Sequence, residues 1–157
     1  MRFKKTKRAV LIIISLLWLA FIFSNSLRNA SSSAEQSHQV AGAVDKVISI
    51  FTTNGGLNTE FLFFIVRKIA HFAEFFILSA LISLTFSSFT EKMSAITPLT
   101  LILCAMVCIG DELLQLFAPG RSCSVYDMLL DFSGGVMAFI LFAICRHVSR
   151  KRKRSKL

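Results

Sequence analysis

The sequence predicts an all-α, polytopic membrane protein, a bundle of four transmembrane helices with an extra interfacial amphipathic helix. The 157-residue chain is 54% hydrophobic, has a mean hydropathy of +0.65 and contains 16 phenylalanines. Its apolar runs reach about 20 residues, the length that crosses a hydrocarbon core of about 30 Å. Most of its 18 basic residues lie outside those runs, in the tails 1–8 and 146–157. A soluble domain of this length could not bury so much apolar surface.

The net charge of +9 does not indicate nucleic-acid binding, because of where the charge lies. Basic tails that flank apolar helices set membrane topology and contact anionic lipids. Placing both tails and Lys92 inside satisfies the positive-inside rule. We therefore predict a multi-pass protein with both termini in the cytoplasm. Membrane lipids are expected as partners, and nucleic acid is not.

The first span is predicted at 9–25, where the basic tail gives way to an apolar run that ends at Ser24-Asn25-Ser26. A basic segment followed by an apolar core would also suit a signal peptide. No clear A-x-A cleavage site follows, however, and this favours an uncleaved anchor.

The segment 32–51 is predicted to be the amphipathic helix, lying outside the bilayer on its interface. Ser32 and Glu35 have the spacing of a capping box. Apolar residues then recur on one helical face, at Val40, Val44, Val47, Ile48 and Phe51. The alternative for this segment is a plain extramembrane loop.

The second span is predicted at 67–89, inside a longer helix from Thr59 to Phe89 that no helix breaker interrupts. Such a helix would measure about 46 Å, more than the hydrocarbon core, so its first turns are expected to protrude. The third span is predicted at 95–117, with Pro98 in its first turn, and the fourth at 125–145. The head of the second helix and the joint between the third and fourth then share the outer side.

The four cysteines predict neither a disulfide framework nor a thiolate metal site. Cys104 and Cys108 lie four residues apart within a span and are expected to be small apolar packing groups. Cys123 lies in the outer joint and Cys145 near the far end of the last helix. We expect these two thiols to be a membrane thickness apart.

Polar residues gather in the two stretches that this topology places outside, RKIAHFAE at 67–74 and GDELLQLFAPGRSCSVYDMLLDFSGG at 110–135. Helical spacing puts Arg67, His71 and Glu74 on one face of the second helix. The acids that end the third helix and begin the fourth are expected to face them. The candidate ligand-binding residues are therefore Arg67, Lys68, His71, Glu74, Asp111, Glu112, Gln115, Arg121, Asp127 and Asp131.

The expected depth of these residues in the membrane indicates that the cluster has a function. An ionisable residue inside hydrocarbon costs about 2.5–3.5 kcal/mol on insertion scales, so many at one depth indicate a use. The guanidinium and ammonium groups of Arg67, Lys68 and Arg121 can hold phosphate or carboxylate, while the acids and His71 can contact amines or hydroxyls. These properties favour recognition of a headgroup in the outer leaflet.

Three other functions stay open. The cluster could catalyse a reaction on the headgroup, so the sequence leaves open whether the protein is an enzyme; the acid–base candidates are His71, Glu74, Asp111 and Glu112. An ion-coupled transporter would need polar groups through the whole membrane, whereas these lie at one end. The polar groups could also only join the helices, at about 0.6 kcal/mol per contact.

A hard divalent metal bound by His71 and the nearby acids is a further alternative. The HxxE spacing of His71 and Glu74 differs from the Glu-x-x-His pattern of carboxylate di-metal bundles. No Gly-rich phosphate loop, HExxH or GxSxG pattern occurs either. We therefore predict no metal and no other cofactor.

Three stretches in fixed order, FIFSNS, RKIAHFAEFFILSALI and DELLQLFAPGRSCSVYDMLLDFSGG, resemble the VanZ-like family of small bacterial membrane proteins. The resemblance covers about 21–143 and implies one VanZ-like transmembrane domain, 1–157, in the bacterial cytoplasmic membrane. The family pattern has a tyrosine where Phe75 stands, so this chain lacks a hydroxyl there. The family's namesake is associated with resistance to the glycopeptide antibiotic teicoplanin, which implies a role in the cell envelope.

The expected function is then binding or modifying a lipid-linked or glycopeptide ligand of the outer leaflet, contributing to teicoplanin-type resistance. A lipid-linked wall precursor and the antibiotic itself are the candidate partners. The oligomeric state stays open, because Gly134, Gly135 and Ala138 could admit a helix of the same chain or of a second copy.

Overall fold

The computed structural model describes residues 2–28, 35, 42 and 59–155. In this part of the chain the structure is all-helical: α1 (Arg2–Ser26), α3 (Thr59–Phe89), α4 (Met93–Gln115) and α5 (Val125–Arg154). Each of the four is long and apolar enough to cross a membrane. The fold class predicted from the sequence is confirmed. The predicted amphipathic helix, 32–51, lies almost wholly outside the described residues.

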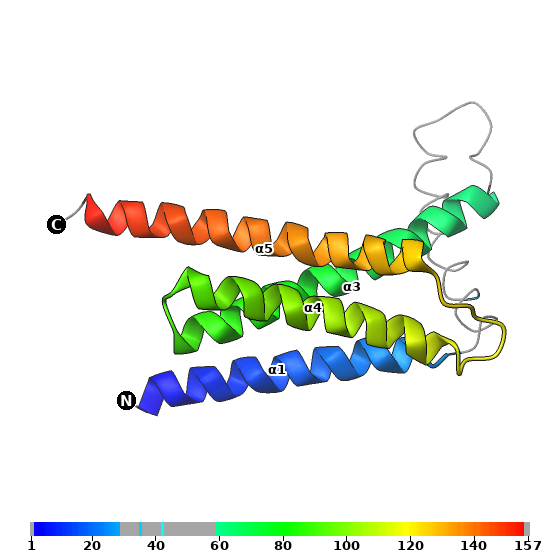
Figure 1. The fold of residues 1–157 in the computed structure, drawn as a ribbon, viewed down its shortest axis with the longest axis horizontal. Helices are drawn as coiled ribbons and strands as arrows, with labels where there is room; N and C mark the ends of the chain where they lie inside the picture. Colours follow the sequence, from blue (N-terminus) through cyan, green and yellow to red (C-terminus); the bar gives the residue numbers. More distant parts are fainter. Residues whose placement is uncertain (1, 29–34, 36–41, 43–58, 156–157) are drawn as a thin grey trace.

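The helices run alongside one another, and both termini lie at the same end of the bundle (Figure 1). The short turn between α3 and α4 is also at that end, which we call the basic end. The loop between α4 and α5 and the start of α3 lie at the opposite end, which we call the polar end. The four described helices therefore begin and end on the same side of the bundle.

The helix bounds differ from the predicted spans mainly in the basic tails. Helix α1 begins at Arg2 and α5 continues to Arg154, because Lys and Arg are good helix formers and no breaker interrupts either tail. Helix α3 is continuous from Thr59 to Phe89, as expected. Helix α4 begins at Met93, so Pro98 lies beyond the first turn, inside the helix. Proline has no backbone N–H to donate to the preceding turn, but Pro98 is exposed and the helix continues unbroken through it.

Glycines on α5 allow α3 and α4 to approach it closely. A Cβ on Gly134 would collide with the backbone carbonyl of Phe72 on α3. A Cβ on Gly135 would collide with the Cys104 sulfur on α4. The glycine pair therefore packs within the chain, in the manner of small residues at transmembrane helix interfaces.

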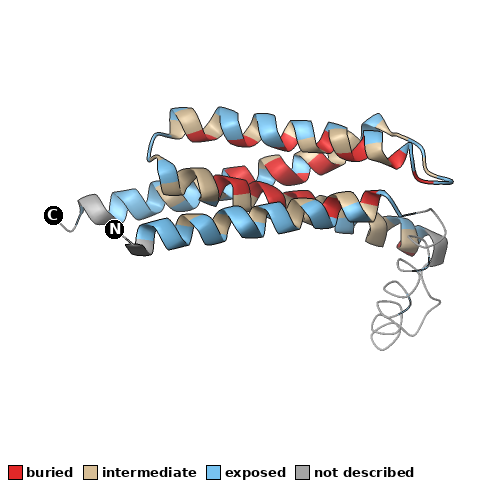
Figure 2. Ribbon diagram, turned by 90° about the horizontal axis from the view of Figure 1, so that it is seen from below, coloured by how far each residue is buried: buried red, intermediate tan, exposed pale blue. Residues whose placement is uncertain are grey.

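Apolar side chains pack along the bundle's interior. The core cluster joins α1, α3 and α4, and its members are Ile22, Phe75, Leu78, Ile82, Cys104 and Cys108. The two mid-helix cysteines thus pack as small apolar groups, as expected. Buried residues follow the inward faces of the helices, and the outward faces are exposed (Figure 2). Those outward faces are themselves apolar, for example at Leu17, Met106 and Ile140, as suits a bundle surrounded by lipid.

Candidate functional site

All four described helices bring polar side chains to the polar end. The most deeply buried are Asp111, Glu112 and Asp131, each 0% exposed, followed by Ser26 at 1% and Gln115 at 3%. Helix α4 supplies Asp111, Glu112 and Gln115 from its last turns, and α5 supplies Asp131 from its second turn. Acidic residues are rarely so buried without a partner or a function.

A hydrogen-bond network anchors the end of α4. Ser26 on α1 donates from its hydroxyl to Asp111 Oδ1, and Gln115 Nε2 donates to Asp111 Oδ2 over 3.1 Å. The same Gln115 nitrogen donates to Glu112 Oε1 over 3.0 Å. Glu112 Oε2 accepts from the backbone N–H of Ser124 over 2.7 Å, immediately before α5. These bonds give Asp111 and Glu112 a defined orientation and tie three segments together.

Helix α1 takes part in the site through residues that sequence reasoning missed. Asn25 donates from Nδ2 to Glu74 Oε1 over 2.9 Å, and the Trp18 indole donates to the Glu74 carbonyl over 2.9 Å. Arg121 donates to the backbone carbonyls of Asn25 and Ser26, over 3.2 and 3.0 Å. The signal for them in the sequence is the polar Ser24-Asn25-Ser26 at the end of the first span, which by itself indicates only where the chain leaves the membrane.

The cations lie nearer the rim than the deepest acids. Lys68 forms an ion pair with Asp127, and their side chains are 25% and 31% exposed. Asp127 lies in the first turn of α5, where Ser124 caps the helix and the helix dipole favours negative charge. Arg67 is also partly exposed, and the described residues give its guanidinium no hydrogen bond or ion pair. Its positive charge can therefore face a ligand.

Arg121 lies in the loop between α4 and α5, outside the spans. Burial lowers the pKa of its guanidinium, and so does the positive charge of Arg67; the charges that oppose this shift belong to Asp111, Glu112 and Glu74. The ordinary pKa of arginine is so high that the group stays charged. Arg121 thus keeps a permanent positive charge close to the buried acids.

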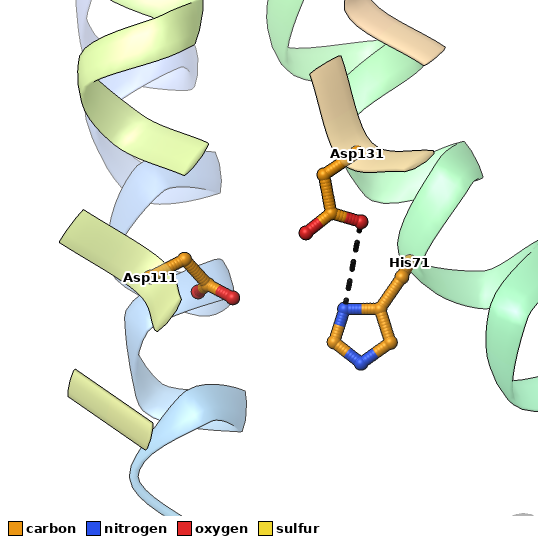
Figure 3. A group of neighbouring side chains, drawn as sticks. All are labelled: His71, Asp111 and Asp131. Atoms are coloured by element: carbon orange, nitrogen blue, oxygen red, sulfur yellow. Dashed lines mark ion pairs between the residues drawn. The ribbon is translucent and has the colours of Figure 1, made fainter. Parts of the chain in front are cut away.

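His71, Asp111 and Asp131 project into one space between α3, α4 and α5 (Figure 3). Each offers a ligand atom, and these three atoms lie within 4.8 Å of one another. His71 Nδ1 is 3.9 Å from Asp131 Oδ1, which is too long for a hydrogen bond. Within the described residues, both Asp131 oxygens and His71 Nδ1 are buried without a hydrogen-bond partner. From the sequence, a metal bound by His71 with Glu74, Asp111, Glu112, Asp127 and Asp131 was only an alternative, and no metal was predicted. Spacing within one helix cannot show which residues on different helices meet, and the structure groups His71, Asp111 and Asp131.

The candidate residues named from the sequence all belong to the polar end, but they divide into separate groups. Glu74 pairs with α1, and Lys68 with Asp127. Asp111, Glu112 and Gln115 share one network. His71 and Asp131 face each other beside it. Phe75, next to Glu74 in sequence, is 0% exposed and packs in the apolar core.

Comparison with known families agrees with these features. The model of the VanZ/LLP1 family matches residues 10–146. The chain belongs to the VanZ/LLP1 family. The match confirms the resemblance seen in the sequence and spans every candidate site residue. Searches of curated proteins and of solved structures give no match.

Proposed function

We propose that the polar end binds the phosphate-bearing headgroup of a lipid, or of a lipid-linked cell-wall precursor, in the outer leaflet of the bacterial cytoplasmic membrane. By binding this ligand, the protein alters the access of glycopeptide antibiotics such as teicoplanin to it. The observation that carries the proposal is the arrangement of charge. Partly exposed cations lie over fully buried acids at one end of a membrane bundle.

Helix joining alone does not account for this arrangement. Polar groups that only hold helices together satisfy one another, as Gln115 does with Asp111 and Glu112. Asp131 is instead fully buried and without a hydrogen bond from the described residues. The described residues also give Arg67 no hydrogen bond, although nearby carboxylates act electrostatically on the neighbouring guanidinium of Arg121. A ligand would supply the missing partners.

Orientation supports an outer-leaflet ligand. The basic tails and Lys92 lie at the end of the bundle opposite the cluster (Figure 1). The positive-inside rule places such residues in the cytoplasm, which leaves the polar end outside. Arg67, Lys68 and Arg121 are of the residue types that bind phosphate. Outer-leaflet wall precursors carry phosphate on a lipid, so they present both the anion and the apolar anchor to this surface.

Native mass spectrometry of the purified protein tests the proposal. The probes are phosphatidylglycerol and undecaprenyl pyrophosphate, with diacylglycerol of matched chains as the uncharged control. We expect both phosphate lipids to bind and Arg67→Ala to weaken them about tenfold, the effect of losing a charge-assisted hydrogen bond of about 1.5 kcal/mol. Arg150→Ala, which removes a cation at the basic end, is the matched control. Equal binding of diacylglycerol, or no effect of Arg67→Ala, would contradict the proposal.

The same samples distinguish a binder from an enzyme. His71 lies beside buried carboxylates, which is an arrangement that could transfer protons. If the protein acts on the headgroup, lipid extracts incubated with it will contain a new species that grows with time. If it only binds, the lipids will be recovered unchanged.

A further inference from the structure

Asp131 is the least satisfied polar side chain of the polar end. It is 0% exposed, and within the described residues neither carboxylate oxygen has a hydrogen-bond partner. A buried carboxylate without such partners is strongly unfavourable, since nothing replaces the water that it lost. Both neighbours that share its space are ligand-type groups, the imidazole of His71 and the carboxylate of Asp111 (Figure 3).

We propose that His71, Asp111 and Asp131 bind one divalent first-row metal ion of the Zn²⁺ or Mn²⁺ kind. The donor set is one imidazole nitrogen with two carboxylate oxygens, from three different helices. Imidazole favours Zn²⁺ and related transition metals, and carboxylate also suits Mn²⁺. A divalent ion would give Asp131 and His71 Nδ1 the partner that the described residues do not offer them.

The geometry suits a metal after a small contraction. The three ligand atoms lie within 4.8 Å of one another. A Zn²⁺ ion at about 2.1 Å from each would hold tetrahedral ligands about 3.4 Å apart. Rotation of the side chains can supply this difference, because His71 is partly exposed and Asp131 is held by no hydrogen bond within the described residues.

Asp111 already has the support that metal-bound carboxylates use. The Ser26 hydroxyl donates to one of its oxygens and the Gln115 amide to the other. Such outer partners orient a ligand and strengthen metal binding by about 10- to 100-fold. Charge around Asp131 also favours a cation, because the carboxylates of Glu74, Glu112 and Asp127 act electrostatically on it.

Three protein ligands leave at least one coordination position for water or another oxygen ligand. This inference does not rest on the proposed headgroup function, because metal binding can be measured without any phosphate lipid. If no metal binds, the proposal that the partly exposed cations bind phosphate lipids still stands and keeps its own test.

The test uses the full-length protein in detergent, purified with a tag that contains no histidine and stripped with a chelator. Equilibrium dialysis against Zn²⁺ alone, followed by elemental analysis, gives the stoichiometry and affinity. We expect one ion per chain, and at least a tenfold loss of affinity in Asp131→Asn and in His71→Gln. Glu91→Gln and His147→Gln remove the same chemical groups at the basic end and should bind as the wild type does. Wild-type stoichiometry near zero, or unchanged affinity in both site variants, would overturn the proposal.

A second measurement does not depend on whether the site variants fold. A chain carrying His38→Gln and His147→Gln keeps His71 as its one histidine. Loaded with Mn²⁺ and examined by electron spin echo envelope modulation, it should show coupling of the ion to an imidazole nitrogen. Replacing ¹⁴N by ¹⁵N in the histidine should change that coupling. A bound Mn²⁺ with no nitrogen coupling would exclude His71 as a ligand and overturn the assignment.

Discussion

The two ends of the bundle use charge in opposite ways. At the basic end, Arg8 donates to the Ser88 carbonyl and Arg146 to the Thr90 carbonyl, and the ion pair of Arg150 with Glu91 is exposed. Those cations complete the turn between α3 and α4, and the side chains of the Arg150–Glu91 pair remain in contact with water. At the polar end, by contrast, the acids are buried. Charge at the basic end agrees with membrane topology and with hydrogen bonds to backbone carbonyls. Buried acids at the polar end oppose insertion into the membrane, which is why we propose a ligand there.

The largest expected effect is an all-or-none difference between the ends in chemical labelling. Intact cells would carry variants that keep only Cys123, at the polar end, or only Cys145, towards the basic end; Cys123 is partly exposed and Cys145 exposed. A membrane-impermeant maleimide should label Cys123 and not Cys145, because the positive-inside rule leaves the polar end outside. Labelling after permeabilisation is the control for reactivity. The reverse pattern would place the cluster in the cytoplasm and remove the outer-leaflet proposal.

The next largest effect is expected when polar-end variants are tested for antibiotic susceptibility. In cells where the wild-type protein alters teicoplanin susceptibility, Arg67→Ala, Glu74→Gln and Asp111→Asn should each abolish most of that effect. Each removes a charge at the polar end, where the ligand is proposed to bind. Glu91→Gln and Arg150→Ala change charge at the basic end and should keep the effect. Minimum inhibitory concentrations, compared at equal protein levels, provide the measurement.

If all three polar-end variants retain wild-type susceptibility, the cluster does not act on the antibiotic's access. The native mass spectrometry experiment would then still show whether the polar end binds a phosphate lipid. The two measurements therefore separate ligand binding from its consequence for the cell.

Close packing at the polar end should be sensitive to one methyl group. Gly134→Ala places a Cβ against the Phe72 carbonyl, so α3 and α5 must separate. We expect a loss of about 1–3 kcal/mol in stability, as for other overpacked interiors. Gly110→Ala is the matched control, since its Cβ would meet the Phe23 ring at 3.8 Å, an ordinary contact. Thermal denaturation in detergent, followed by size-exclusion chromatography, should show a lower midpoint for Gly134→Ala alone.

The smallest effect is expected at the exposed ion pair of the basic end. Arg150 Nη2 lies 3.4 Å from Glu91 Oε2, and the Glu91 side chain is 90% exposed. Exposed pairs contribute about 0–1 kcal/mol, so Glu91→Gln should leave the denaturation midpoint nearly unchanged. A large shift in that midpoint would show that the basic end also depends on specific charge pairs, and the contrast between the two ends would fail.

The four spans, the family and the gathering of polar residues at one end could all be predicted from the amino-acid sequence. Those features depend on local properties: the length of apolar runs, the position of basic residues, and the helical periodicity that put Arg67, His71 and Glu74 on one face. Because successive spans cross in opposite directions, hydropathy alone also predicts that the start of α3, the end of α4 and the start of α5 lie on the same side.

Which polar groups meet depends on how the helices pack against one another. The sequence predicts that Arg121 holds phosphate or carboxylate, yet in the structure it also donates to two backbone carbonyls of α1. Asn25 and Ser26 join the site from α1, a helix that contributes none of the candidate residues predicted from the sequence. Gly134 packs against α3 of the same chain. Asp131 is left beside His71 without a hydrogen bond in the described chain, while Asp127, one turn away, pairs with Lys68. These outcomes depend on the rotation and separation of neighbouring helices, which periodicity within one helix does not specify.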